Sequence, residues 1–133
     1  MSTFHTQILT PTGVAYEGDT ESVKIPGTLG SFEVRRNHAS MVSLMNIGVA
    51  RINSSESKEL YFAISGGFTE IHDNTVIIMA EAAEQQDKID VERAKRAKEK
   101  AEEELEKGPT DLTMREAEMK LKRAINRIKV SEI

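Results

Sequence analysis

The chain has 133 residues, 30% of them charged, with a formal net charge of −4 and no cysteine. The lack of cysteine excludes disulfides, thiolate zinc sites and cysteine nucleophiles, and it suits a reducing compartment. The longest apolar run, at residues 76–80, is too short to span a bilayer, and the first residues do not resemble a signal peptide, so we expect a soluble, cytoplasmic protein.

The composition changes abruptly after residue 86. Residues 1–86 hold 5 Lys/Arg and 10 Asp/Glu, together with all six aromatic residues, all three histidines and seven of the eight glycines. Residues 87–133 hold 13 Lys/Arg and 12 Asp/Glu and no aromatic residue or histidine. The first composition is typical of strands and turns, and the second of solvated helices. We predict a β domain at 1–86 followed by a helical segment at 87–133 that is too polar to have a deep core.

Residues 1–86 predict short strands separated by turn residues. The expected strands are residues 4–10, 14–16, 22–25, 31–34, 41–45, 48–52, 60–65, 68–71 and 75–79. Turn signals every 8 to 12 residues favour a sandwich or barrel. Within this pattern, Gly66-Gly67 indicates a bulge or a close backbone approach, and Asp73-Asn74 predicts a hairpin turn.

Helical periodicity begins near Asp87 and continues to Gly108-Pro109, a pair that ends helices. The second helix begins with Thr113, which with Glu116 fits a capping box, although a start at Asp111 fits nearly as well. The apolar stripe of the first helix is Ala94, Ala97, Ala101 and Leu105, and that of the second is Met114, Ala117, Leu121, Ala124 and Ile128. Such narrow stripes and a short link predict an antiparallel hairpin with a thin, Ala-rich seam.

Motifs for catalysis are missing from the sequence. It contains no phosphate-binding loop, no zinc-protease motif and no serine-hydrolase motif. His5, His38 and His72 lie in separate strands or turns, so structural or surface roles are favoured over a metal site. No basic stripe is interleaved with aromatic residues, which argues against nucleic acid.

One group of charged residues suggests a ligand. Asp90, Arg93 and Lys100 share a sector of the first helix, and Lys120, Arg123 and Arg127 form a basic row on the second. In an antiparallel hairpin Arg123 and Arg127 come near the start of the first helix. Several cations beside a helix N-terminus would suit a polyphosphate, while Asp90 could accept a hydrogen bond from an amino-bearing base. The alternative is a pair of ordinary solvated helix faces, which are common.

Four stretches make the chain resemble the epsilon subunit of bacterial F-type ATP synthases over its whole length. They are Phe62-Ala63-Ile64-Ser65-Gly66-Gly67-Phe68, Ala80-Glu81-Ala82-Ala83-Glu84, Ile89-Asp90-Val91-Glu92-Arg93-Ala94 and Leu121-Lys122-Arg123-Ala124-Ile125-Asn126-Arg127. The resemblance implies a β-sandwich of about ten strands followed by a two-helix hairpin, and a subunit without catalytic activity.

The same resemblance implies where such a subunit works. The sandwich (1–86) would dock in the rotor, beside the gamma subunit and on the ring of c subunits, at the cytoplasmic side of the bacterial membrane. The hairpin (87–133) would be regulatory: folded, or extended into the catalytic alpha/beta head, where it inhibits ATP hydrolysis. In some members ATP, bound without being hydrolysed, holds the folded form.

Site residues carried over from the family fall into three sets. The ATP contacts would be Glu84, Ile89, Asp90, Arg93, Ala94, Lys100, Arg123 and Arg127. The inhibitory contacts would be Lys120, Lys122, Arg123, Arg127 and Lys129, and the c-ring contacts Gly30, Ser31 and His38. The family has Arg where this chain has Lys100, which keeps the charge but loses the planar fork. Residues 34–40 also depart from the family pattern. No metal is expected.

Three hypotheses remain open from the sequence. The chain is a rotor subunit with an ATP-sensing hairpin, or a rotor subunit whose hairpin inhibits without binding nucleotide. From a different class, it is a β-domain scaffold with a helical hairpin in another multiprotein assembly.

Overall fold

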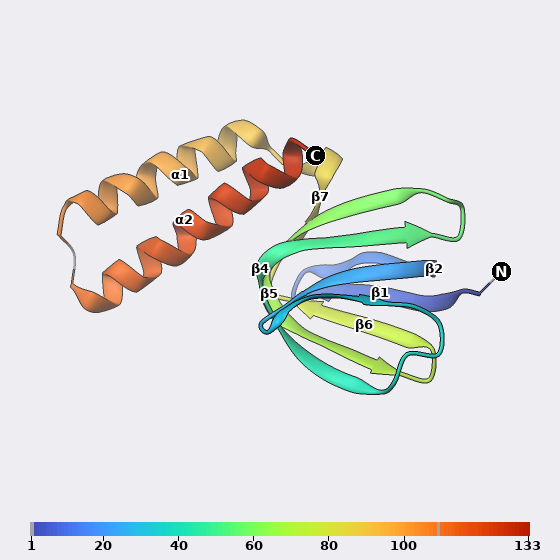
Figure 1. Ribbon diagram of the computed structural model, residues 1–133. Coiled ribbons are helices and arrows are strands. Elements are labelled where there is room, and N and C mark those ends of the chain that lie inside the picture. Colours follow the sequence, from blue (N-terminus) through green and yellow to red (C-terminus); the bar gives the residue numbers. More distant parts are fainter. Residues whose placement is uncertain (1, 109) are drawn as a thin grey trace. The chain divides into compact units, whose positions relative to one another are not determined.

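The computed structural model describes residues 2–108 and 110–133 (Figure 1). The chain divides into two compact units, residues 1–86 and residues 87–133. Pro109, half of the Gly108-Pro109 stop signal predicted above, lies outside the described residues. In the part of the chain that is described, no helix is both long enough and apolar enough to cross a membrane.

The first unit is a single curved sheet of seven strands. The strands are β1 (Phe4–Thr10), β2 (Gly13–Gly27), β3 (Gly30–Val34), β4 (Met41–Ser54), β5 (Glu59–His72), β6 (Thr75–Ala80) and β7 (Ala83–Gln85). Their order is β1-β6-β5-β4-β2-β3, β7 pairs with β5, and β1 also pairs with β2. This last pairing closes the sheet into a sandwich or barrel, as the turn pattern predicts. The pair β1–β6 is parallel and the other pairs are antiparallel.

Three long strands explain why the sequence predicts more strands than the structure contains. Residues 14–16 and 22–25 both belong to β2, residues 41–45 and 48–52 both belong to β4, and residues 60–65 and 68–71 both belong to β5. The pairing of β2 with β4 changes register twice along its length, so each strand bends while remaining continuous. Turn residues inside these strands mark bends, not strand ends.

Alternating apolar side chains fill the interior of the closed sheet. The fully buried ones include Ile8, Val23, Ile25, Ile52, Phe62, Ile64, Val76 and Ile78. They come from β1, β2, β4, β5 and β6, so every strand of the closed ring contributes to one core. β-branched residues dominate because they pack well on a pleated surface.

Gly67 is a position that the fold requires to be glycine. Its φ is +126°, and a Cβ there would lie 2.0 Å from the carbonyl oxygen of Met79. The close backbone approach predicted from Gly66-Gly67 is therefore confirmed. The predicted turn at Asp73-Asn74 is also confirmed, because both residues have positive φ and join β5 to β6.

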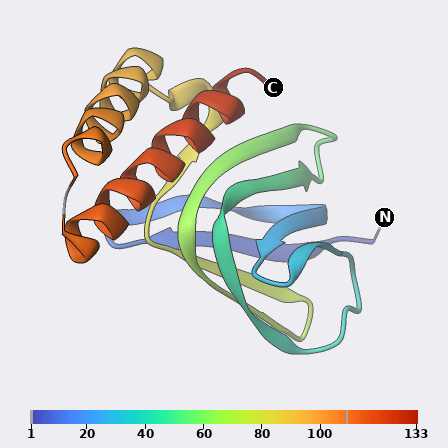
Figure 2. The ribbon, with the colours of Figure 1, turned by 60° about the vertical axis from the view of Figure 1, so that its left-hand side comes forward.

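The second unit is a pair of antiparallel helices, seen side by side in Figures 1 and 2. A short 3-10 helix (Gln86–Lys88) precedes α1 (Val91–Glu106), and α2 covers Asp111–Ser131. The seam buries four of the predicted alanines and one further residue: Ala94, Ala101, Ala117, Ala124 and Val130. Met114 was predicted in the stripe but is 37% exposed, because it lies in the first turn of α2, close to the connection between the helices.

Each helix has a recognisable N-cap. The Asp90 side chain accepts from the N–H of Arg93 at 3.0 Å and begins α1. The predicted capping box at Thr113 is wrong: α2 begins at Asp111, the alternative start, and its N-cap is Thr110. Thr113 instead donates from its hydroxyl to the Thr110 carbonyl oxygen, because that carbonyl lies within one helical turn. After α1, Gly108 has the left-handed φ of +62° expected of a helix stop.

Candidate functional site

A pocket of about 320 Å³ lies between α1 and α2 within the second unit. Its lining is Ala97, Lys100, Ala101, Glu104, Lys120, Arg123 and Arg127. The two alanines have no side chain beyond Cβ, so the longer charged side chains surround an open space. Charged residues dominate the lining because the apolar stripe of this hairpin is so narrow.

The pocket is strongly cationic. Four of its lining residues carry a positive charge and one, Glu104, carries a negative charge. The Lys120 Nζ lies 4.0 Å from the Glu104 Oε2, an ion pair that joins the two helices. Among the lining residues, positive charges outnumber negative charges by three, and such a lining suits an anion that carries several charges.

Three of the residues predicted to bind nucleotide line this pocket: Lys100, Arg123 and Arg127. Sequence reasoning placed them on facing helices, and the structure brings them together. Glu104 and Lys120 also line the pocket but were not among the predicted nucleotide contacts. Lys120 could have been included from its spacing, because it precedes Arg123 by three residues, whereas Glu104 stands out only by its distance to Lys120.

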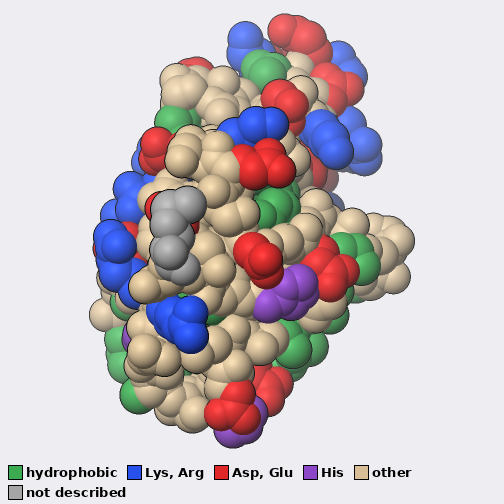
Figure 3. All heavy atoms as spheres, turned by 90° about the vertical axis from the view of Figure 1, so that its right-hand side faces the viewer, with side chains coloured by type: hydrophobic (Ala, Val, Ile, Leu, Met, Phe, Trp, Pro, Cys, Tyr) green, Lys and Arg blue, Asp and Glu red, His purple; other side chains and the backbone are tan. Residues whose placement is uncertain are grey.

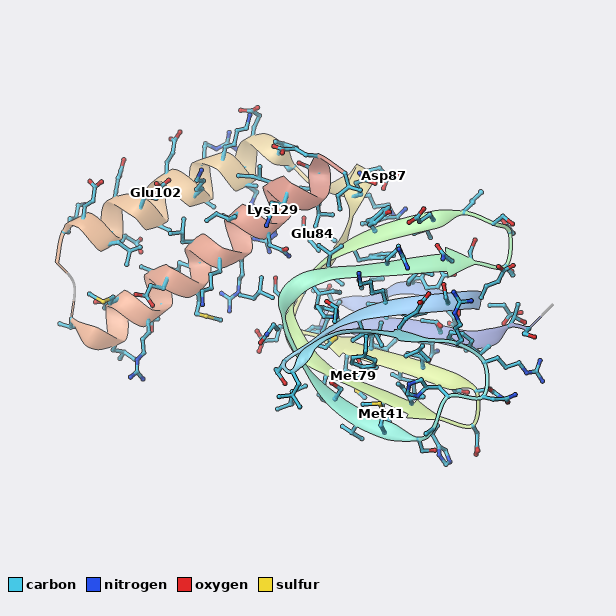
Figure 4. The ribbon with its side chains drawn as sticks, viewed as in Figure 1. Met41, Met79, Glu84, Asp87, Glu102 and Lys129 are labelled. Carbon is cyan, nitrogen blue, oxygen red and sulfur yellow. The ribbon has the colours of Figure 1, made fainter. Side chains whose placement is uncertain are left out.

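The other predicted contacts do not line the pocket. Asp90 and Arg93 lie at the start of α1, Ile89 and Ala94 are buried, and Arg93 is exposed. Arg93, Ala97, Lys100 and Glu104 follow one another at spacings of four, three and four, so Arg93 shares the α1 face that lines the pocket. Glu84 lies on β7 in the first unit, where Figure 4 shows it.

The five basic residues predicted to carry inhibition lie on two sides of α2. Lys120, Arg123 and Arg127 line the pocket. At 3.6 residues per turn, Lys122 and Lys129 lie about 130–150° around the helix from the middle of that row. Both are exposed, and Figure 4 shows Lys129 near the end of α2. A single basic row therefore contains three of the five residues.

A second feature of α2 was missed by sequence reasoning. A groove of about 280 Å³ on its surface is lined by Leu112, Arg115, Glu116, Met119, Lys120 and Arg123. Leu112 is 69% exposed and Met119 is 40% exposed. These two residues lie outside the seam stripe, so the pattern of one apolar face does not predict them.

The residues predicted to face the c ring lie on neighbouring segments of the first unit. Gly30 begins β3 with a φ of +124°, Ser31 follows it, and Leu29 at the preceding turn is fully exposed. His38 lies in the connection from β3 to β4, with its ring centroid 6.5 Å from that of Phe32 on β3. The three predicted residues therefore come together around β3.

The connection between β3 and β4 is attached to the β5–β6 turn. The Asn37 N–H donates to Asn74 Oδ1 at 2.6 Å, and Asn74 Nδ2 donates to Asn37 Oδ1 at 3.2 Å. A second contact joins the same two segments: Ser40 Oγ lies 3.1 Å from His72 Nδ1. These contacts hold the connection between β3 and β4 in place.

A pocket in the first unit was also not predicted from the sequence. It measures about 510 Å³ and lies where β2 and β4 part between Lys24 and Gly27, next to Gly30 and Ser31. Arg51 is among its lining residues, with its Nε 3.8 Å from Glu59 Oε1 and its terminal nitrogen 3.7 Å from Glu33 Oε1. The pocket depends on a shift in strand register, which no local sequence pattern reveals.

His5 on β1 lies beside two carboxylates that raise its pKa. Its Nε2 lies 2.9 Å from Glu17 Oε2 and its Nδ1 lies 3.5 Å from Asp19 Oδ1. The hydrogen bond with Glu17 raises the pKa of His5, partial burial opposes this, and Asp19 raises it further. Figure 3 shows one face of the molecule, on which histidine side chains lie beside carboxylates. No group of three or more metal-ligating side chains occurs among the described residues.

Comparison with known proteins gives matches along the whole chain. The family described as "ATP synthase, Delta/Epsilon chain, beta-sandwich domain" matches residues 3–86, and "ATP synthase, Delta/Epsilon chain, long alpha-helix domain" matches residues 87–132. The ATP synthase epsilon chain of Bacillus pumilus is 44% identical over 131 residues, covering 98% of each chain. That of Syntrophomonas wolfei is 42% identical over 131 residues, covering 98% of this chain and 96% of its own.

Solved structures support the fold. A chain in the cryo-EM structure of the Euglena gracilis mitochondrial ATP synthase, OSCP/F1/c-ring, matches with a TM-score of 0.82 at 20% identity, covering 95% of this chain and 79% of that one. A chain in the Tetrahymena thermophila central stalk and c ring matches with a TM-score of 0.65 at 14% identity, covering 96% and 95%. Together with the sequence matches, these findings show that the chain belongs to the ATP synthase epsilon chain family, a family of non-catalytic subunits of that enzyme.

Proposed function

We propose that this chain is a regulatory rotor subunit of a bacterial F-type ATP synthase. The sandwich couples the gamma subunit to the c ring, with Gly30, Ser31 and His38 facing the ring, at the cytoplasmic side of the membrane. The hairpin inhibits ATP hydrolysis when it extends into the catalytic alpha/beta head, and bound ATP favours the folded, non-inhibitory form. Family membership argues against the third hypothesis, a scaffold of an unrelated assembly.

The cationic pocket between α1 and α2 carries the ATP part of this proposal. A triphosphate bears about four charges at neutral pH, and Lys100, Arg123 and Arg127 supply three cations in one place. Arginine forks suit phosphate oxygens because they donate two parallel hydrogen bonds. Lys100 acts there as a point charge, and this weakens binding relative to members with arginine at the same position.

The nucleoside end of ATP would lie toward the start of α1. Asp90 and Arg93 occupy that end, and Arg93 shares the α1 face of Lys100. One Asp90 oxygen accepts from the Arg93 N–H, and a carboxylate has a second oxygen that can accept from an amino group of the base. The buried residues Ile89 and Ala94 fix the first turn of α1, so their contribution is to hold this end in shape.

ATP regulates because it binds one form of the hairpin better than the other. A ligand at 100 times its dissociation constant stabilises the form it binds by about 2.7 kcal/mol. A modest preference for the extended form is then reversed, since the shift equals the difference in binding free energy. The ligand does not need to be hydrolysed.

The basic row of α2 links ATP binding to inhibition. Lys120, Arg123 and Arg127 line the pocket, and in the extended form the same cations would meet acidic segments of the catalytic head. ATP and the catalytic head would therefore compete for them. Lys122 and Lys129 lie away from the pocket, so they can contribute to inhibition without contributing to ATP binding.

Calorimetric titration of the whole chain with ATP tests the proposal. We expect binding, an ATP-dependent rise in melting temperature, at least tenfold weaker binding in Arg93→Ala, and tighter binding in Lys100→Arg. A wild-type chain whose melting temperature does not respond to millimolar ATP would leave the second hypothesis, an inhibitory hairpin that does not bind nucleotide.

A separate experiment tests inhibition. Assembled enzyme in which this subunit lacks residues 110–133 should hydrolyse ATP faster than enzyme with the whole chain, while the sandwich still co-purifies with the complex. Neutralising Lys120, Arg123 and Arg127, the three cations of the α2 row, should also raise ATP hydrolysis. Unchanged hydrolysis in a fully assembled complex would show that the hairpin does not inhibit.

A further inference from the structure

We propose that Lys120 is a fourth phosphate-binding cation of the pocket and that Glu104 is its counterion in the ligand-free hairpin, so that the two residues make the pocket selective for a triphosphate. This inference rests on the proposed ATP site and concerns which part of the ligand each end of the pocket recognises.

The first observation is the weakness of the Glu104–Lys120 pair. Its atoms are 4.0 Å apart, beyond hydrogen-bond distance, and the Lys120 and Glu104 side chains are 57% and 36% exposed. Exposed pairs of this kind contribute little to stability. A phosphate group carries more charge and more acceptor oxygens than a carboxylate, so it can replace Glu104 as the partner of Lys120.

The second observation is the order of the cations along α2. The pair joins Glu104, late in α1, to Lys120, near the middle of α2. In antiparallel helices this register places Arg127 toward the start of α1, Arg123 one turn further along, and Lys120 furthest away. The row from Arg127 to Lys120 covers about 10 Å at 1.5 Å per residue, which fits a chain of phosphates better than a single group.

Orientation then assigns the terminal phosphate. With the base near Asp90 and Arg93, the phosphate chain runs along the row toward Lys120. A triphosphate reaches Lys120 and displaces Glu104, whereas a diphosphate leaves Glu104 paired and close to its own negative end. Glu104 therefore disfavours shorter ligands, and Lys120 favours longer ones.

The test measures binding of ATP, ADP and inorganic tripolyphosphate to the whole chain by calorimetry. Lys120→Gln should weaken the binding of ATP about three- to tenfold and the binding of ADP less, so that the ratio of ATP affinity to ADP affinity falls. Glu104→Gln should tighten the binding of ATP about two- to fivefold. In the double variant the effect of Glu104→Gln should shrink, because its partner is gone.

The chain offers a matched control. Glu92 and Lys95 on α1 also form an ion pair at 4.0 Å, but neither lines the pocket. Glu92→Gln and Lys95→Gln change the net charge equally and should alter ATP affinity less than twofold. If these variants match the effects at Glu104 and Lys120, only the overall charge matters and the inference is overturned.

The outcomes separate this inference from the proposed function. A wild type that binds ATP, with Lys120→Gln unchanged or with ATP and ADP weakened equally, overturns the inference alone. If the wild type binds tripolyphosphate through Lys120 but binds ATP no more tightly, ATP sensing is overturned and the assignment of Lys120 to a phosphate stands. Binding of neither ligand at millimolar concentration overturns both.

Discussion

The sandwich and the hairpin are stabilised by different means. The sandwich buries Ile8, Ile25, Ile52, Phe62 and Ile78 in a core shared by five strands. The hairpin buries mostly alanines along one seam. A fully buried Ile or Phe contributes roughly 1.5–3 kcal/mol, and alanine much less because it removes less apolar area from water.

This difference suits the two proposed roles. A domain that transmits torque between partners needs a core that resists deformation, and close packing provides it. A hairpin that exchanges between partners needs helices that separate at a low cost in free energy. The Ala-rich seam allows close approach of the helices while burying little area, and the four predictions that follow test this contrast.

The largest expected effect follows cutting the chain after residue 86. The fragment 1–86 should keep a cooperative thermal transition, because all strands and the core lie within it. The fragment 87–133 should be largely unfolded, since isolated helices of this length are marginal in water. Circular dichroism of both fragments measures this. A folded 87–133 beside an unfolded 1–86 would reverse the comparison.

The second prediction concerns the depth of the core. Ile78→Ala on β6 removes a fully buried side chain and should lower the free energy of unfolding by about 2–5 kcal/mol. The control is Ile125→Ala on α2, which is 38% exposed and should cost far less. Urea unfolding of the whole chain reports both. Equal losses would show that the hairpin is as tightly packed as the sandwich.

The third prediction concerns the seam. Ala117→Leu places a larger side chain where alanine is fully buried, and should destabilise the helix pair by about 1–3 kcal/mol. Hydrogen exchange should accelerate in α1 and α2 and remain unchanged in the strands of the sandwich. Met114→Leu, at an exposed position, is the control. Slower exchange in the Ala117 variant would mean that the seam has room for larger residues.

The smallest expected effect is the pH dependence of His5. Because its folded pKa is raised above the ordinary 6.5, charged His5 stabilises the sandwich fully below about pH 6.5, and this contribution is lost as pH rises through the raised pKa. The change should be well under 1 kcal/mol, since the side chain is 40% exposed. Unfolding free energies of wild type and His5→Gln should therefore converge as pH rises. Parallel curves would show that the charge on His5 does not contribute to the stability of the sandwich.

Much of the fold follows from local patterns in the sequence. Spacing predicted the buried seam at Ala94, Ala101, Ala117 and Ala124, and glycine chemistry predicted the close approach at Gly67. The strand count was less accessible, because a bend within one continuous strand carries the same turn residues as a true strand end. The cap of α2 was misplaced for a similar reason: Thr110 and Thr113 both suit an N-cap, and only the helix start distinguishes them.

The candidate pocket shows a sharper limit. Lys100, Arg123 and Arg127 could be grouped from helical spacing and an assumed antiparallel hairpin. Glu104 could not, because it lies in a run of similar residues on α1, and only its distance to Lys120 distinguishes it from its neighbours. Local spacing finds residues that share a face, whereas pairing across two helices depends on their register.

The parallel pairing of β1 with β6 has a consequence for how the chain folds. His5 pairs with Thr75, so this pairing joins residues about seventy positions apart. Contacts of such long sequence separation form slowly, because a large loop must close before they stabilise anything. During synthesis β1 can pair with β2 early, but its pairing with β6 requires almost the whole sandwich to have been made, and the helices follow β6 in the chain. The rate of folding is then determined by the meeting of β1 and β6, and substitutions in the hairpin should leave that rate unchanged.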